Sequence, residues 1–188
     1  MVVARQYLLV NVICGTIPFL MLPVLTRYLS PEDFGIVALY TSIVAVVSAV
    51  FTLGVNGAVS RIYFDLSEKG FADFVGACLV LILISTIGFS ILISIFSHQI
   101  ENGSKFPASW LWAVIITACA QAVLNVGLAV FQVRNMVRQF AVVQVFQIIL
   151  LAIVAIVLVV FLDYDWRGRI SAQIISVSTA AVGLLYYL

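Results

Sequence analysis

Charged residues are scarce in this chain. They make up only 9% of its 188 residues, and its nine lysines and arginines nearly balance its eight acidic residues. With 64% hydrophobic residues, the chain has too little polar surface to cover a soluble globule. The formal net charge of +1 gives no indication of a nucleic-acid partner. The composition therefore indicates a protein that lies within a membrane.

Cysteine and histidine are also rare, which limits the chemistry that the chain can perform. Cys14, Cys78 and Cys119 all lie within apolar sequence, and their spacing is not that of a metal site. His98 is the single histidine and has no partner at motif spacing. The sequence contains neither a nucleophile–base pair nor a glycine-rich phosphate loop. We therefore expect no catalytic residues, no metal ion and no cofactor, and the protein is not expected to be an enzyme.

Long apolar runs fill most of the sequence. Each is close to the ~20 residues that a helix needs to cross the hydrocarbon core of a bilayer. The runs predict an all-α membrane protein whose six transmembrane helices form one lobe over residues 1–188. The predicted helices are about 6–25, 31–57, 74–97, 108–131, 139–162 and 170–188.

The second helix is predicted to begin ahead of its apolar part. Ser30 is a favourable N-cap residue, and Pro31 suits the first helical position. Glu32 and Asp33 follow in the first turn, where the helix dipole favours acidic side chains.

Basic residues in the connections predict the orientation of the chain. The side that carries the N-terminus would hold Arg5, Arg61, Lys69, Arg134 and Arg138. The opposite side would hold Arg27, Lys105, Arg167 and Arg169, the last two in a loop over residues 163–169. Because basic residues are enriched in cytoplasmic loops, we expect the N-terminus to be cytoplasmic in a multi-pass protein of the inner (cell) membrane.

Uncharged polar residues recur at helical spacing inside the apolar runs. The second helix carries such a stripe at Thr41, Ala45, Ser48, Thr52 and Asn56, and the third carries one at Thr86, Ser90, Ser94 and Ser97. Two interpretations remain open. Small and polar residues let helices pack closely and hydrogen-bond to each other. Alternatively, the same residues line a hydrated cavity for a polar substrate.

Amides are the best candidates for such a cavity, because they bind sugar hydroxyls without imposing a charge. The candidate substrate-cavity residues are Asn11, Asn56, Gln121, Asn125, Gln144 and Gln147. Four arginines near predicted helix ends are candidates for contact with a lipid diphosphate, or else serve only as topology anchors. These are Arg5, Arg61, Arg134 and Arg138, the last two four residues apart and expected on one face.

Several segments resemble a known family. Residues 27–35 (RYLSPEDFG), residues 53–58 (LGVNGA) and the pair Ser60-Arg61 resemble the start of the polysaccharide flippases. These are the Wzx-type O-antigen and exopolysaccharide transporters, in the multidrug/oligosaccharidyl-lipid/polysaccharide exporter superfamily. Residues 166–169 (WRGR) resemble the fifth loop of that family.

The resemblance implies a fold of 12–14 helices in two six-helix lobes around a central cavity. It also implies export of lipid-diphosphate-linked oligosaccharide units for cell-surface polysaccharide, including the O-antigen of lipopolysaccharide. This chain would be the N-terminal lobe, and its end within an apolar helix indicates a fragment of a longer protein. Its implied partners are the bilayer, the missing C-terminal lobe or a second copy, and the polymerase and glycosyltransferases that make the glycan.

Two alternatives stay open. One is a multidrug or cation antiporter of the same superfamily, although no apolar run has a carboxylate at its centre to couple ion movement. The other is a non-transporting membrane scaffold or a truncated remnant.

Overall fold

The computed structural model describes the backbone of residues 2–103 and 110–187, and the side chains of residues 5–55, 57–93 and 110–187. Within these residues, six helices are long and apolar enough to cross a membrane, which confirms the predicted all-α fold class. The elements are α1 (Val2–Tyr28), α2 (Pro31–Thr52), α3 (Val55–Ile62), α4 (Glu68–Gly103), α5 (Leu111–Val133), α6 (Val137–Ile156), the π-helical segment η2 (Val157–Phe161) and α7 (Asp165–Tyr187).

The start of α2 has the cap that its sequence predicts. The Asp33 amide donates to the Ser30 hydroxyl oxygen at 3.2 Å, and the Ser30 amide donates to a carboxylate oxygen of Asp33 at 3.2 Å. This reciprocal pair is a capping box, with Pro31 at the first helical position. It satisfies amides that would otherwise have no partner at the helix end.

The predicted second helix, 31–57, is too long by one turn. It ends at Thr52, because Leu53 and Gly54 both adopt left-handed conformations, with φ of 43° and 75°. The chain then turns into the short helix α3, which packs on α4 and α5. Asn56 therefore belongs to α3 and does not continue the polar stripe of α2. Its side chain lies outside the described residues.

Helix α5 is the centre of the lobe. About 67% of its membrane-span residues are buried, compared with 11% in α6. It packs against α2, α3, α4, α6 and α7. The large side chains buried at its contacts include Tyr40 and Phe51 of α2 and its own Leu124. The Tyr40 hydroxyl lies 2.6 Å from the hydroxyl of Thr117 and so joins α2 to α5.

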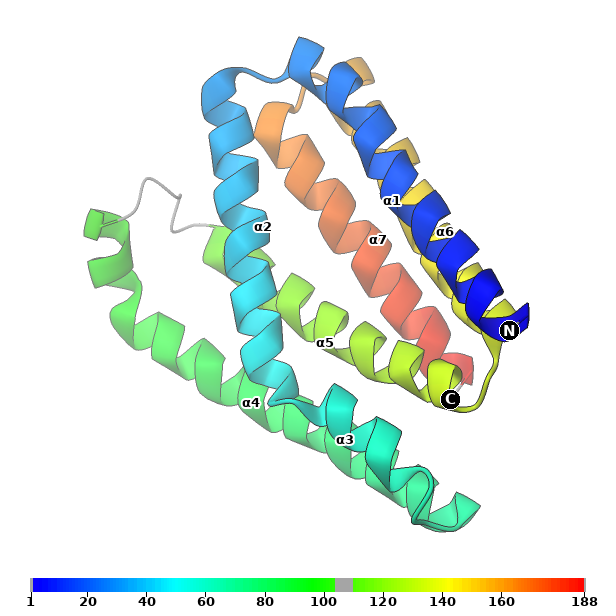
Figure 1. Cartoon of the computed structure of the whole chain (residues 1–188). Coiled ribbons are helices and arrows are strands. Elements are labelled where there is room, and N and C mark those ends of the chain that lie inside the picture. Colours follow the sequence, from blue (N-terminus) through cyan, green and yellow to red (C-terminus); the bar gives the residue numbers. More distant parts are fainter. Residues whose placement is uncertain (1, 104–109, 188) are drawn as a thin grey trace.

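Helices α1, α2, α6 and α7 form a wedge (Figure 1). Helices α1 and α2 meet at the end where they are connected and diverge toward the other end, with α7 behind the gap between them (Figure 1). Helix α6 runs beside α1 and packs against both α1 and α7. The N- and C-termini lie at the same end as the α5–α6 connection (Figure 1), as an even number of crossings requires.

Helices α5 and α7 pack closely at Gly127 because glycine has no Cβ atom. A Cβ atom at this position would collide with the Leu184 side chain, which is fully buried. Glycine therefore allows the two helices to approach closely, as small residues do between membrane helices.

We expect Gly127→Val to destabilise the lobe by about 1–3 kcal/mol, because the added methyl groups overpack this contact. Thermal unfolding of the purified chain in detergent would measure the loss. Gly76→Val is the matched control, because a Cβ at Gly76 meets no atom within 4 Å. Equal melting temperatures for the two variants would contradict the close packing.

Candidate functional site

A polar recess opens between α2, α5 and α7. Its volume is about 360 Å³, and hydroxyls of α2 face amides of α5 and α7 across it. The polar residues that line it are Thr41, Ser48, Thr52, Gln121, Asn125 and Gln173.

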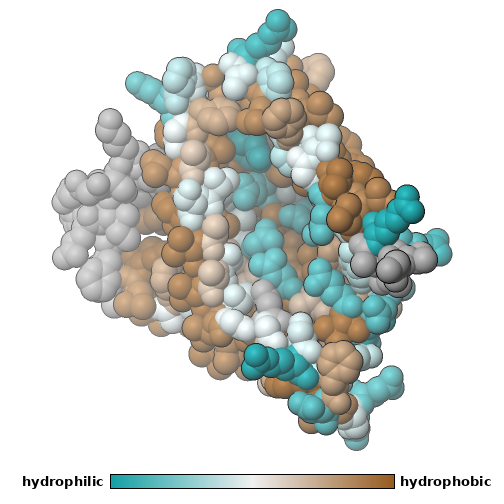
Figure 2. All heavy atoms as spheres, in the orientation of Figure 1, coloured by the Kyte–Doolittle hydropathy of each residue, from teal (hydrophilic) through white to brown (hydrophobic). Residues whose placement is uncertain are grey.

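A second recess of about 270 Å³ lies between α1, α3, α5 and α6. Its polar lining consists of Asn11, Ser60, Asn125, Gln132 and Gln144. Asn125 lines both recesses, so they meet at this side chain, and we refer to them together as the polar hollow. Hydrophilic residues gather in a recess in the middle of this face, surrounded by hydrophobic surface (Figure 2).

The amides of the polar hollow retain unused hydrogen-bonding capacity. Gln121 Nε2 donates to Asn125 Oδ1 at 3.3 Å, which fixes the two side chains relative to each other on successive turns of α5. Gln144 Oε1 is buried without a hydrogen-bond partner among the described residues. A buried polar atom without a partner costs free energy unless water or a ligand satisfies it. The hollow is therefore suited to a guest that supplies hydroxyl groups.

The hydroxyl stripes divide between the two interpretations that the sequence left open. Thr41, Ser48 and Thr52 line the polar hollow, although each hydroxyl also donates to a carbonyl of its own helix at 2.9–3.0 Å. Thr86 and Ser90 of α4 donate to carbonyls within that helix and line neither recess. For α4, the described part of the stripe, Thr86 and Ser90, therefore lies outside the hollow. Ser94 and Ser97 lie outside the described side chains.

Four of the predicted cavity residues come together in the polar hollow. These are Asn11, Gln121, Asn125 and Gln144. Gln147 is half-buried on α6 but lines neither recess, because it lies one turn beyond Gln144.

Gln173 is a lining residue that the sequence analysis missed. It lies among the polar residues Ser171, Ser176, Ser178 and Thr179 of the last predicted helix. Its spacing of four residues from Arg169 and three from Ser176 places these side chains on one face of α7 and could have marked it.

Arg169 was predicted in a loop, and this prediction was wrong. Helix α7 begins at Asp165, so Arg169 lies inside the helix and its Nη1 atom is buried without a partner. It borders an apolar pocket of about 310 Å³ between α1, α2 and α6. Gly168 lets the first turns of α7 approach η2 closely, because a Cβ there would lie 3.0 Å from Leu158 Cβ. Ionisable groups inside a membrane usually serve a function.

The four arginines predicted to meet a diphosphate are distributed around one end of the lobe. Arg5 is exposed near the start of α1, and Arg61 lies exposed in the last turn of α3, beside Ser60 of the hollow. The predicted common face of Arg134 and Arg138 is wrong. Arg134 caps α5 and Arg138 opens α6, with a left-handed residue, Asn135 (φ 55°), between them. Arg134 instead lies over the Phe71 ring, 5.5 Å from its centre.

Tryptophans mark the opposite end of the lobe. The ring centre of Trp110 lies 5.2 Å from that of Trp166 and 6.0 Å from that of Trp112. Clustered tryptophans are typical of the boundary between the hydrocarbon core and water. Arg169 lies one turn beyond Trp166, and therefore just inside this boundary.

The described residues contain no group of three or more histidine, cysteine or acidic side chains that could hold a metal ion. Cys14, Cys78 and Cys119 are free thiols. The site is thus built from neutral amides and hydroxyls, with arginines near both ends.

The chain is similar to a known protein family and to a known membrane protein. Residues 6–188 match a family described as polysaccharide biosynthesis protein. The chain is also 26% identical over 183 residues to an uncharacterized membrane protein of Haemophilus influenzae. That alignment covers 97% of this chain but 42% of the relative, so the chain spans less than half the length of that protein. None of the solved structures matches the chain.

We expect the polar hollow to contain water, which thiol labelling can test. In a chain whose three native cysteines are replaced by alanine, Asn125→Cys and Gln144→Cys should react with a membrane-impermeant maleimide. The matched control, Ile153→Cys, lies on the exposed outer face of α6 and should face lipid. We expect labelling at least roughly tenfold faster in the hollow, because the reactive thiolate forms where water reaches the sulfur. Equal labelling at all three positions would contradict a hydrated hollow.

Proposed function

The chain belongs to the polysaccharide biosynthesis protein family, and we propose that it forms one lobe of a flippase for lipid-diphosphate-linked oligosaccharides. These units would serve the synthesis of cell-surface polysaccharide such as O-antigen. The observation that carries the proposal is the polar hollow, which is lined by amides and hydroxyls within an otherwise apolar bundle. The sugar headgroup would pass through the hollow, while the lipid tail stays in the bilayer.

The chemistry of the hollow suits a neutral sugar. A sugar presents many hydroxyls, and an amide offers both donors and an acceptor to them. Gln121, Asn125 and Gln173 would meet the sugar from two helices, and Gln144 would contribute its free Oε1 from a third. Because these side chains are uncharged, they would bind a succession of sugar units without holding any one of them tightly.

The basic residues at the end of the lobe near both termini would receive the diphosphate. Arg5 and Arg61 are the best placed, since Arg61 adjoins Ser60 at the rim of the hollow. A planar guanidinium group matches the geometry of a phosphate group. This end would lie on the cytoplasmic side of the cell membrane, where glycosyltransferases assemble lipid-linked sugars. On this basis, Arg134 and Arg138, which point to other surfaces, contribute less to the capture.

A single lobe cannot complete the transport cycle. Alternating access requires two halves that rock about a shared site. The length of the Haemophilus influenzae relative supports a second half of comparable size. We propose that this half, or a second copy of the chain, closes the open side of the polar hollow.

We expect the joint substitution of Gln121→Leu and Asn125→Leu to reduce translocation by about tenfold or more in the full-length protein. Each lost hydrogen bond is worth about 0.5–1.5 kcal/mol. Translocation is read from the surface glycan of cells that lack the native gene and express the variant. Gel electrophoresis and antibody binding measure this glycan. Lipid-linked oligosaccharide should accumulate in the same cells.

The control for this test is Gln147→Leu, which removes a half-buried amide outside the hollow. It should display normal glycan at the same level of protein in the membrane. Normal display in the Gln121/Asn125 double variant would refute the role of the hollow. A change in drug susceptibility with normal glycan would instead favour a multidrug antiporter.

A further inference from the structure

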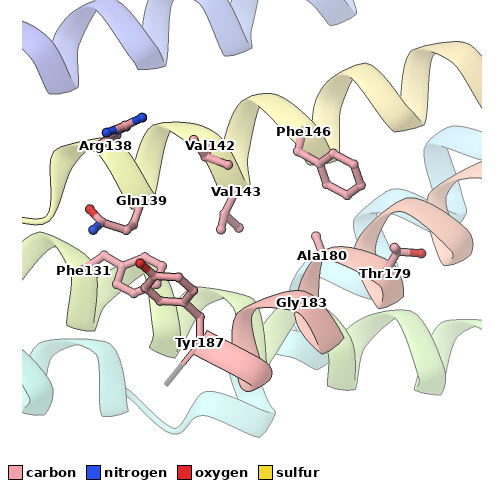
Figure 3. Close-up of a pocket in the computed structure, with 10 residues that line it drawn as sticks. All are labelled: Phe131, Arg138, Gln139, Val142, Val143, Phe146, Thr179, Ala180, Gly183 and Tyr187. Atoms are coloured by element: carbon pink, nitrogen blue, oxygen red, sulfur yellow. The ribbon is translucent and has the colours of Figure 1, made fainter.

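A mainly apolar groove lies between α6 and α7, where both approach the end of α5. It encloses about 390 Å³ and is lined on α6 by Arg138, Val142 and Phe146, on α7 by Gly183 and Tyr187, and on α5 by Phe131. Figure 3 shows Arg138 and Gln139 at the same end as Phe131 and Tyr187, with Phe146 and Thr179 toward the other end. We call it the α6–α7 groove.

The α6–α7 groove runs along the axes of the two helices. Arg138, Val142 and Phe146 recur every four residues, so they form one row along α6. The row is about 12 Å long at a rise of 1.5 Å per residue. No atom lies within 4 Å of a Cβ placed on Gly183, so the groove is open at this point. Its dimensions suit part of a hydrocarbon chain.

The α6–α7 groove faces away from the polar hollow. On α6 the hollow is lined by Phe140 and Gln144, whereas the groove is lined by Val142 and Phe146. An offset of two residues turns an α-helix by about 200°, so this row lies on the opposite side of α6 from the hollow. Gln139 and Val143 line the edge of the groove that is nearer to the hollow. The side chains of Val142 and Phe146 are 61% and 48% exposed. A lobe whose hollow faces its other half therefore presents this groove to the acyl chains of the bilayer.

The positive charge of the groove lies at one end of it. Arg138 is exposed there, in the first turn of α6, which contains no acidic residue. Beside it, the rings of Phe131 and Tyr187 meet edge to face with centres 6.1 Å apart. Tyrosine and arginine near helix ends are typical of the headgroup level of a bilayer. The groove thus combines a mainly apolar lining with a cation at its headgroup end.

We propose that the α6–α7 groove binds an anionic phospholipid of the membrane leaflet on the side of the chain termini. The lipid phosphate contacts the Arg138 guanidinium, and one acyl chain lies along Val142, Phe146 and Gly183. Charge complementarity selects the occupant, because an arginine at the headgroup end favours a net negative headgroup over a zwitterionic one. The lipid-facing position of the groove rests on the two-lobe arrangement proposed above, whereas lipid binding can be measured without transport.

Native mass spectrometry of the purified chain tests this site, with phosphatidylglycerol and phosphatidylcholine of identical acyl chains as probes. We expect phosphatidylglycerol to be retained about fivefold more strongly, the effect of one basic residue near an anionic surface. Arg138→Gln should abolish this preference. Arg134→Gln, a cation at the same end of the lobe that lies over Phe71, should preserve it.

A second pair of variants tests whether an acyl chain occupies the α6–α7 groove. Gly183→Leu fills the α6–α7 groove and should weaken the binding of both lipids, whereas Gly76→Leu on α4 should weaken neither. Each variant must melt at the temperature of the parent chain in detergent before its lipid binding is compared.

Three results would overturn the proposal. The first is an equal loss of phosphatidylglycerol in the Arg134 and Arg138 variants, which would indicate a diffuse surface charge effect. The second is unchanged binding in Gly183→Leu, which would show that no acyl chain occupies the groove. The third is a dimer of the parent chain that forms without lipid and that dissociates in the Gly183→Leu variant. A second copy of the chain, and not a lipid, would then occupy the groove.

Discussion

The absence of water from the hydrocarbon core of the bilayer is the constraint on which this structure depends. Every backbone amide and carbonyl within that core needs a partner inside the protein, and a helix supplies one for nearly all of them. Side-chain hydroxyls obey the same constraint, since those of Thr41, Ser48 and Thr86 all donate to carbonyls of their own helices. An amide has more donors and acceptors than its own helix satisfies, and Gln121, Asn125 and Gln144 lie in a shared hollow.

Helix α5 combines the packing of the lobe with its polar site. Gly127 allows a close approach to Leu184 of α7, while Thr117 joins the helix to Tyr40 of α2. Gln121 and Asn125 occupy successive turns between these two contacts and face the hollow. The positions of the amides are therefore held by the most buried helix of the lobe. A rigid support of this kind favours a defined spacing between the groups that would contact a sugar.

Helix α6 separates two environments. Gln144 on one side faces the polar hollow, while Val142 on the other faces the α6–α7 groove. An amphipathic helix in a soluble protein divides water from core, but here the division is between a hydrated hollow and lipid. Arg138 at the start of this helix belongs to the lipid side, although its place in the sequence, near Arg134, gives no indication of this.

Local sequence patterns predicted the six spans, the start of α2 at Ser30 and Pro31, and the amide pair on α5. These features follow from run length, local capping and four-residue spacing, all of which act within one helix. Backbone geometry and helix packing set the break at Leu53 and Gly54, the burial of Arg169, the place of Gln173 in the hollow and the separation of Arg134 from Arg138. A left-handed residue breaks a helix without interrupting the pattern of hydrophobic residues, and hydrophobic periodicity cannot show which neighbouring helix a polar side chain faces. Those outcomes depend on how α1, α2, α6 and α7 pack around α5.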